Sequence, residues 1–458
     1  MGKSPPVLFQ SKPLCFSLLY LFASLFLALY TSLSPTKCLL RSSPFDPLQS
    51  PLFSYPPSYG EHKYALPTAR PACSAAVLFS DYSKAVEEIG ELCANSSWTS
   101  LSSPQPPPLR YKQGRDDRFG GTFGGRERFS YFDHRDDSVE VPCGFFKEFP
   151  ISMDDREAME KCSGAVVVSA VFNDHDKIRQ PRGLGSRTLT TVCFFMFVDS
   201  TTTRVLESHD LIPRNPRAAR KIGAWRIVEV VGERLYENDP AMNGVIPKHL
   251  VHRLFPNSKF SVWIDAKLQM VVDPVLLVHS LLVREGVDMA VSRHPYFVHT
   301  MEEAMATARW KKWWDVDSLQ KQMETYCENG LQPWSQNKLP YTSDVPDSAL
   351  ILRRHTPATN LFSCLLFNEL DAFNSRDQLA FAYVRDLMSP KPKLHMFDVE
   401  VFEQVVLEYR HNLKRGRAAS APGRAGAPRR TKRAGSPELS GNGSFGGGCG
   451  KYLEEMWE

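Results

Sequence analysis

Between residues 140 and 412, six short apolar segments alternate with stretches of helical periodicity, and this alternation constrains the fold more than any other feature. Segments that are apolar at every position predict strands covered on both faces, as in a mostly parallel sheet. These segments are 164–172, 191–199, 224–231, 260–265, 287–292 and 348–353. Helices are predicted after Asp273-Pro274 and over 360–373 and 376–387. The pattern therefore predicts an α/β fold, a Rossmann-like sandwich around a mostly parallel central sheet.

The N-terminus carries an uncharged apolar stretch, Leu14 to Leu33, that contains no proline. About 20 such residues cross the hydrocarbon core of a bilayer as one helix, and the stretch exceeds the apolar core of ordinary cleaved signal peptides. Basic residues flank it almost evenly, so charge decides its orientation only weakly. We expect a cytoplasmic tail over 1–13, an uncleaved transmembrane signal anchor over 14–33 and a lumenal remainder. A cleaved signal peptide is the alternative.

Two segments that flank the predicted domain have compositions that disfavour regular structure. Residues 34–139 are rich in Pro, Ser and Gly, which predicts a largely disordered stem before a folded domain over 140–412. Residues 413–458 are basic and of low complexity, which predicts a disordered tail. The net charge of +4 is too close to balance to indicate a nucleic-acid partner, and no aromatic residues interleave with the basic run in the tail.

Two features agree with a lumenal location. Asn95 and Asn442 begin Asn-x-Ser triplets, which are acceptor sequences for N-glycosylation. The chain has ten cysteines, and an oxidising lumen would permit disulfides among them. Those in the predicted domain are Cys143, Cys162, Cys193, Cys327 and Cys364. No group of Cys and His residues has the spacing of a zinc motif, so the sequence does not indicate a structural zinc site.

The sharpest local signal is Trp263-Ile264-Asp265-Ala266-Lys267, where a predicted buried strand ends in an acidic residue. Ligands of open α/β sheets bind at the carboxyl ends of the strands. A carboxylate there can hold a divalent cation such as Mn²⁺, which in turn holds a nucleotide diphosphate. GT-A-like glycosyltransferases use Asp-x-Asp at this position. Either a metal site at Asp265 is completed elsewhere, or Lys267 itself meets the diphosphate. The alternative is an aspartate that only caps the next turn.

A second group of polar residues surrounds the strand over 348–353. Asp344 and Asp347 precede the strand, and two carboxylates three residues apart could bind sugar hydroxyls or act as a base. Arg353 ends the strand and could contact a phosphate. The alternative is a proline-containing turn with solvated acids and surface arginines.

A third group begins the predicted helix over 376–387. Arg376, Asp377 and Gln378 fall in its first turn, after the candidate N-cap residues Asn374 and Ser375. The helix dipole would keep Asp377 ionised, which suits a general base or an acceptor of hydrogen bonds from a sugar. The same position would serve simple helix capping.

Two further signals are weaker. Arg293 and His294 close another predicted strand, which would place them beside the aspartate described above if the sheet is parallel. A lone histidine also serves structural roles. Trp310, Trp313 and Trp314 could form a platform on which a sugar stacks, although aromatic residues at helical spacing also form cores.

Three long motifs carry a resemblance to a known family: residues 247–274 (PKHLVHRLFPNSKFSVWIDAKLQMVVDP), 292–296 (SRHPY) and 338–381 (KLPYTSDVPDSALILRRHTPATNLFSCLLFNELDAFNSRDQLAF). In this order they resemble the plant glycosyltransferase-like domain shared by the turgor-regulation-defect protein and the mucilage-related probable hexosyltransferase. The resemblance covers roughly 140–412. It implies a single-pass type II protein of the Golgi membrane that acts in the synthesis of a cell-wall polysaccharide such as pectin. One branch of the family has been assigned a ceramidase activity.

The resemblance also carries residue positions. The polar positions that recur in the family correspond here to Asp265, Lys267, Arg293, His294, Asp344, Arg353, Arg376, Asp377 and Gln378. Arg354 stands where many members have an acidic residue, and the basic tail after residue 413 matches no part of the family pattern.

These observations lead to one functional prediction, a glycosyltransferase that moves a sugar from a nucleotide-sugar donor to a polysaccharide acceptor. Asp265 would position the donor diphosphate, through Mn²⁺ if a metal is used, and Lys267 or Arg353 would offset the charge on the leaving phosphate. Asp377 or Asp344 would orient or deprotonate the acceptor hydroxyl. The remaining recurring residues would contact the donor.

Two rival functions stay open. A lipid amidase such as an alkaline ceramidase is one, although the sequence contains no HExxH or GxSxG motif. A non-catalytic protein that binds a glycan or a nucleotide sugar is the other, because the motif reads Asp-x-Lys.

Overall fold

The computed structural model describes most of the predicted domain together with several segments that precede it. The described residues are 12–32, 38–41, 46–48, 51–59, 76–94, 109–112, 125–133, 140–143, 149–215, 220–231, 236, 239–310, 315–410, 449 and 453.

An eight-stranded sheet forms the centre of the domain, in the order β13-β11-β12-β9-β5-β6-β8-β7. Its strands are β5 (Ala165–Val171), β6 (Val192–Val198), β7 (Lys221–Ile222), β8 (Trp225–Glu229), β9 (Phe260–Ile264), β11 (Met289–Arg293), β12 (Pro346–Arg354) and β13 (Leu394–Phe397). β9, β5, β6 and β8 pair in parallel, as do β11 and β13. β12 runs antiparallel to both of its neighbours, and β7 runs antiparallel to β8. The prediction of a mostly parallel central sheet is confirmed.

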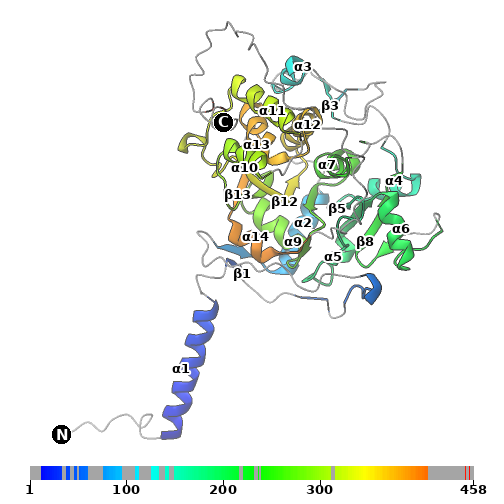
Figure 1. Ribbon diagram of the computed structural model, residues 1–458. Coiled ribbons are helices and arrows are strands. Elements are labelled where there is room, and N and C mark those ends of the chain that lie inside the picture. Colours follow the sequence, from blue (N-terminus) through cyan, green and yellow to red (C-terminus); the bar gives the residue numbers. More distant parts are fainter. Residues whose placement is uncertain are drawn as a thin grey trace.

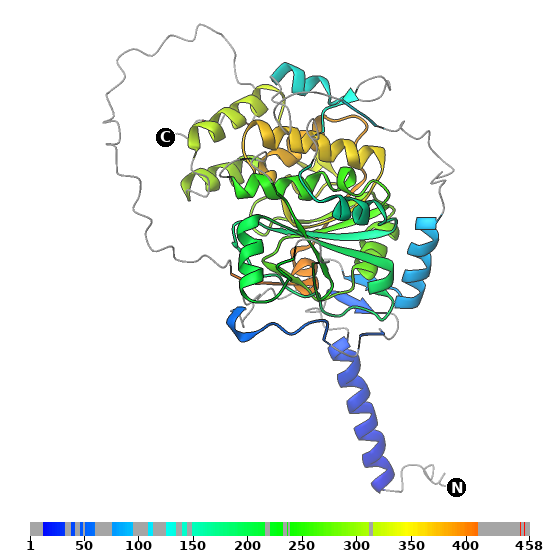
Figure 2. The same cartoon turned by 90° about the vertical axis from the view of Figure 1, so that its right-hand side faces the viewer.

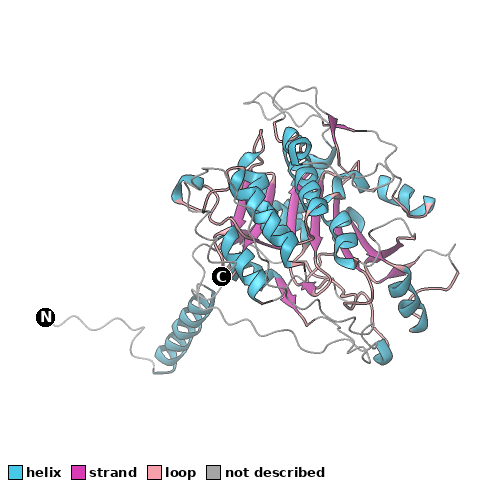
Figure 3. Ribbon diagram, turned by 45° about the horizontal axis from the view of Figure 1, so that its top comes forward, coloured by secondary structure: helices cyan, strands magenta, loops and turns pink. Residues whose placement is uncertain are grey.

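Alternating side chains of each strand enter two separate cores, one on each face of the sheet. Val166 and Val168 of β5 belong to the first core, whereas Val167 between them belongs to the second. Both faces are therefore apolar, which explains why each predicted strand reads as a continuous hydrophobic run. Figure 3 shows the strands lying between helices.

Different helices cover the two faces. Over the first core lie α4 (Met153–Glu160), α7 (Pro240–His249), α8 (Val251–Leu254), α10 (Thr300–Arg309), α11 (Val316–Glu328), α12 (Pro357–Ala372) and α13 (Asp377–Leu387). Over the second lie α2 (Tyr82–Ala94), α6 (Ser200–Ser208), α9 (Pro274–Val278) with its π-helical continuation His279–Val283, and α14 (Val399–Val405). The view in Figure 2 shows this layered arrangement.

Local chemistry sets where these helices begin. Asp273 caps α9, because its side chain accepts a hydrogen bond from the amide of Val275, and Pro274 occupies the first helical position. Asp239 and Pro240 start α7 in the same way. Thr356 and Pro357 start α12.

Part of the segment predicted as a disordered stem is folded onto the domain. Within 34–139, α2 packs against α9 and buries Tyr82, Ala85, Val86 and Ile89. These residues lie on one face of an amphipathic helix, so they gain stability by leaving water. The smaller elements of the chain are β1 (Leu39–Arg41), β2 (Val77–Phe79), β3 (Arg110–Tyr111), α3 (Gly125–Ser130), β4 (Glu140–Val141), α5 (Thr188–Thr191), β10 (Leu268–Met270), β14 (Val406–Glu408) and the 3₁₀ turns Pro57–Tyr59 and Gln336–Lys338.

The predicted membrane anchor is one helix, α1 (Lys12–Ser32), which Figure 1 shows outside the α/β domain. Its segment Lys12–Leu29 is long and apolar enough to cross a bilayer, and none of it is buried. A signal sequence near an N-terminus would pass the same test of length and composition.

Three disulfides join described residues: Cys143–Cys364, Cys162–Cys193 and Cys327–Cys449. The last one ties a residue of the predicted disordered tail to the end of α11. Disulfides of this kind agree with an oxidising compartment.

Candidate functional site

A cavity of about 670 Å³ lies where β5 and β9 end. Ala170, Val171 and Phe172 line it from the end of β5, and Trp263 and Asp265 line it from β9. The remaining lining residues are His175, Asp176, Asp239, Pro240, Ala241, Gly244, Val245, Lys248 and Ser375. Such a position, at the carboxyl ends of neighbouring parallel strands, is where open α/β sheets bind their ligands.

Asp265 stands on the wall of this cavity with a fixed orientation. Its backbone amide donates to the carbonyl of Ala349 (2.8 Å), which holds it beside the start of β12. The indole Nε1–H of Trp263 donates to its Oδ1 (2.7 Å). The Asp265 side chain is 32% exposed, and no other hydrogen bond from the described part of the chain reaches this carboxylate. Its Oδ2 is therefore available to a ligand.

Lys248 is a cation on the cavity wall, and no sequence pattern predicts this role for it. Its ammonium lies 2.8 Å from Asp377 Oδ2, 3.3 Å from Ser348 Oγ and 3.8 Å from Asp265 Oδ1. Burial opposes its charged form, yet the carboxylates of Asp377 and Asp265 raise the pKa of Lys248 above its ordinary value. Asp377 and Ser348 hold the ammonium from one side, and it lies on the cavity wall beside Asp265.

Asp377 lies behind Lys248 and is buried. Its carboxylate accepts from Lys248, from His249 Nε2 (3.2 Å) and from Ser348 Oγ (2.6 Å). Burial opposes its ionisation, but Lys248 and His249 hold the pKa of Asp377 far below its usual range. A carboxylate so strongly stabilised is a poor base, and its evident effect is to orient Lys248.

The buried His249 completes this network. Burial lowers its pKa to about 4, so the imidazole is neutral near pH 7. Its Nδ1 lies 3.3 Å from Arg353 Nη2, which donates to it. Arg353 is fully buried and pairs in register with Ser261, at the opposite end of β9 from Asp265. The geometry therefore places Arg353 beneath the site rather than on the cavity wall.

Ser348, Asp377 and His249 are the three residue types of a hydrolytic triad, but their order differs. In a triad the imidazole stands between the serine and the carboxylate and takes the serine proton. Here the Ser348 hydroxyl donates to Asp377 directly, and the second imidazole nitrogen faces Arg353. The arrangement cannot activate Ser348 as a nucleophile.

Lys267 and Asp347 lie near Asp265 on the edge of the sheet but do not line the cavity. Lys267 pairs with Glu408 of β14 at 2.8 Å. Burial opposes the charge of Lys267, while Asp265 and Glu408 raise its pKa. Burial is also the main reason why the pKa of Asp347 rises to about 6.

Asp344 is fully buried in a separate network. Lys338 Nζ lies 2.9 Å from its carboxylate and Arg385 Nη2 lies 2.6 Å from it. Burial opposes ionisation, but hydrogen bonding to His299 and the charge of Arg385 lower the pKa of Asp344. These contacts tie the loop before β12 to α13, and they leave the carboxylate no access to the cavity.

The other predicted residues do not line the cavity. Arg293 at the end of β11 pairs with Asp398 (3.2 Å). Arg376 follows the cavity residue Ser375 and pairs with Glu303 of α10, which also lies 4.0 Å from His294 Nε2. Gln378 follows in the first turn of α13 and is half-buried.

The side chains around Asp265 do not suit the binding of a divalent cation. Mg²⁺ and Mn²⁺ prefer several oxygen ligands, whereas Asp265 lies beside one ammonium and is electrostatically coupled to a second, Lys267. Asp176 and Asp239 share the cavity, but they form no group of three ligand atoms with Asp265 within 4.8 Å among the described residues.

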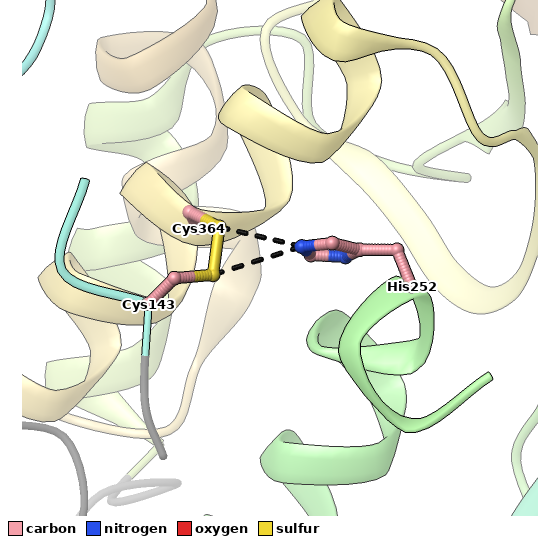
Figure 4. Close-up of side chains that lie close together, drawn as sticks. All are labelled: Cys143, His252 and Cys364. Atoms are coloured by element: carbon pink, nitrogen blue, oxygen red, sulfur yellow. Dashed lines mark hydrogen bonds between the residues drawn. A yellow bond between two sulfur atoms is a disulfide. The ribbon is translucent and has the colours of Figure 1, made fainter. Parts of the chain in front are cut away.

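One group of described residues does have ligand atoms within 4.8 Å of one another: Cys143, His252 and Cys364. Figure 4 shows that the two sulfurs are joined in a disulfide and that the imidazole points at both. His252 Nε2 lies 3.4 Å from the sulfur of Cys364 and 3.6 Å from that of Cys143. Metal binding requires free thiolates, so this group is a structural disulfide.

The sequence matches the model of the TOD1/MUCI70 glycosyltransferase-like domain over residues 108–411. The chain belongs to the TOD1/MUCI70 family. The match begins well before residue 140, which agrees with the described elements that precede β5. Membership of this family makes the chain a glycosyltransferase-like enzyme.

Two relatives of the TOD1/MUCI70 family come from Arabidopsis thaliana. One, named alkaline ceramidase TOD1, is 63% identical over 90% of this chain and 87% of its own length. The other, named probable hexosyltransferase MUCI70, is 38% identical over 74% of this chain and 58% of its own length. The names of these two relatives therefore point to different chemistry.

Solved structures show only distant likeness. Mouse xyloside xylosyltransferase 1 aligns with a TM-score of 0.30 and 9% identity, over 51% of this chain and 85% of its own. The bifunctional glycosyltransferase WbbM aligns with a TM-score of 0.26 and 10% identity, over 51% of this chain and 39% of its own.

Proposed function

We propose that the chain is a hexosyltransferase that takes a nucleotide sugar as donor and a cell-wall polysaccharide such as pectin as acceptor. One observation carries the proposal: Asp265 and Lys248 face the same cavity at the carboxyl edge of the parallel strands. A carboxylate accepts hydrogen bonds from the hydroxyls of a sugar or a ribose, and an ammonium donates to a diphosphate. Together they match the two polar parts of a nucleotide sugar.

In this reaction the bond from the anomeric carbon to the diphosphate oxygen breaks, and a bond to the acceptor oxygen forms. Negative charge develops on the leaving diphosphate, where the ammonium of Lys248 stabilises it. Asp377 and Ser348 hold that ammonium in place, so little reorganisation is needed at the moment of transfer. Asp265 orients the donor through its hydroxyls.

The acceptor hydroxyl must lose a proton. Asp344 and Asp377 already accept hydrogen bonds from cationic side chains, whereas the pKa of Asp347 lies at about 6, close to the range that suits a general base. Asp347 is the second residue of β12 and lies two residues before Ala349, whose carbonyl accepts from the Asp265 amide. Asp347 lies near Asp265 at the edge of the sheet but not on the cavity wall, so we propose that it takes the proton from an acceptor hydroxyl that approaches the donor from this edge, in preference to Asp344 or Asp377.

No metal ion takes part in the proposed reaction. The residues around Asp265 do not fit Mn²⁺, and Lys248 supplies the positive charge that a divalent cation would bring to the diphosphate.

The decisive experiment measures release of nucleoside diphosphate from UDP- and GDP-sugars by the full-length protein in detergent. Asp265→Asn should lower kcat by about 10²-fold or more, as loss of one group that contacts the reacting donor does in other enzymes. The matched control is Asp317→Asn on the exposed side of α11, which should retain full activity. Unchanged turnover in Asp265→Asn would remove the basis of the proposal.

The relative named alkaline ceramidase makes lipid amide hydrolysis the second candidate. That reaction needs an activated nucleophile or a metal-bound water. The Ser348, Asp377 and His249 network has the wrong order, and the Cys143–His252–Cys364 group is closed by a disulfide. Fatty-acid release from labelled ceramide by the same preparation, abolished by Asp265→Asn, would favour this second candidate over the first.

We also propose a Golgi location with the domain in the lumen. The apolar helix α1 and three disulfides among described residues support it. Protease protection of a C-terminal tag in sealed microsomes tests the orientation, and co-localisation with Golgi markers tests the compartment.

A further inference from the structure

An exposed aromatic surface lies just beyond the end of β11. We call Tyr296, Phe297 and Trp310 the aromatic surface. Tyr296 is 77% exposed, the largest value among the exposed large hydrophobic residues described outside α1, and Trp310 is 60% exposed. Of the two alternatives that the sequence left open for Trp310, sugar platform or core, the exposure excludes the core. Trp313 and Trp314 lie outside the described residues.

The rings are held in a defined arrangement. The backbone amides of Phe297 and Tyr296 approach His294 Nδ1 at 3.1 and 3.3 Å, which closes the turn around the imidazole. The ring of Phe297 stacks on that of His294 with centroids 5.2 Å apart, and it lies 6.3 Å from the ring of Trp310. Because backbone and ring contacts position the aromatic surface, a ligand would meet it with little loss of conformational entropy.

The turn is connected to the candidate site through two contacts. The amide of His294 donates to the carbonyl of Val345 (2.9 Å), which joins the turn to the segment that leads into β12 and Asp347. Glu303 lies 4.0 Å from His294 and also pairs with Arg376, the neighbour of the cavity residue Ser375. The aromatic surface therefore lies on the same edge of the sheet as the cavity.

The apolar faces and polar edges of a sugar ring complement this surface. Their C–H bonds form apolar faces, while their hydroxyls point outward to water or to polar groups. Tyr and Trp offer a flat apolar face together with a polar edge. Exposed aromatic side chains that are grouped on the same edge of a sheet as a cavity are typical of a binding surface.

We propose that Tyr296 and Trp310 form a subsite that binds a sugar ring of the glycan acceptor by stacking. The inference rests on the proposed glycosyltransferase function and adds the place where the acceptor chain lies. A polysaccharide is long enough to cover both the subsite and the acceptor position beside the donor cavity.

The test separates donor chemistry from acceptor binding. Tyr296→Ala/Trp310→Ala in the full-length protein should raise the KM for pectic oligosaccharides about 10-fold, the size expected from the loss of two aromatic contacts. Hydrolysis of the nucleotide sugar without acceptor, and the donor KM, should not change. Tyr296→Phe/Trp310→Phe should restore acceptor binding, and Met153→Ala, a control that is 64% exposed on α4, should behave as wild type.

An unchanged acceptor KM in the Ala variant would overturn the inference, as would an equal fall in donor hydrolysis. If no nucleotide sugar is hydrolysed, the proposed function fails, and affinity electrophoresis in gels with pectin still decides the subsite. If pectin retards the wild-type protein but not the Ala variant, the result supports the subsite. Equal or absent retardation, or a change of oligomeric state in the Ala variant, would refute it.

Discussion

The buried pair between Lys248 and Asp377 allows the site to be tested through stability as well as through activity. Lys248→Met keeps most of the side-chain volume but leaves the Asp377 carboxylate, 5% exposed, without its cation. Removing one partner of a buried ion pair costs about 3–5 kcal/mol in free energy of unfolding. Lys248→Met/Asp377→Asn removes both charges and should cost at least about 2 kcal/mol less than Lys248→Met alone.

The dependence on pH follows from the same pair. The pKa of Asp377 is depressed in the folded protein, so its contribution to stability is present above about pH 4, its unfolded value, and is lost as the pH falls through the folded value. Lys248→Met removes most of this contribution. The difference in unfolding free energy between wild type and Lys248→Met should therefore shrink in acid.

Urea unfolding followed by tryptophan fluorescence measures both effects. A loss of less than about 1 kcal/mol in Lys248→Met would refute the reasoning, because exposed ion pairs have that size. A double variant that is as unstable as Lys248→Met would also refute it. If the double variant folds, its affinity for UDP-sugars should still be about 10-fold or more below wild type, since a charge-assisted hydrogen bond contributes roughly 1.5–3 kcal/mol.

Three further predictions concern the metal, Asp347 and the disulfide. Treatment with EDTA should leave the affinity for UDP unchanged in isothermal titration, and a requirement for added Mn²⁺ would show that Lys248 does not replace a metal. The pKa of Asp347 is raised to about 6 from roughly 4 in the unfolded chain, so wild type should lose stability relative to Asp347→Asn as the pH rises from 4 to 6; parallel pH profiles would contradict this. Cys143→Ser/Cys364→Ser should lose about 2–5 kcal/mol of unfolding free energy, and insensitivity of wild type to reductant would argue that the disulfide adds nothing.

Much of the fold could be predicted because local patterns reported it directly. Both faces of β5, β6 and β9 are buried, and a strand of that kind must be apolar at every position. Asp273-Pro274 begins a helix for reasons that lie within a few residues. The family motifs and the apolar helix α1 are likewise properties of contiguous sequence.

Other features depend on contacts that no local pattern reports. α2 lies in a segment of stem-like composition, yet it folds because α9 offers an apolar surface to its buried face. β10 and β14 are short and pair with each other across the chain, so their existence depends on tertiary structure.

By itself the sequence determined the type of fold, the apolar N-terminal helix and the placement of Asp265 at the end of an interior strand. Only the tertiary structure decided which charges meet there. Lys248 is separated in sequence from Asp377 and Ser348, and it becomes the cation of the cavity because α7, α13 and β12 converge behind it. Arg353, Asp344 and Asp377 carry suitable chemistry in sequence, but burial and ion pairing commit each to a partner. The free energy of a charged group is set by its neighbours in space, and neighbours in sequence do not reveal them.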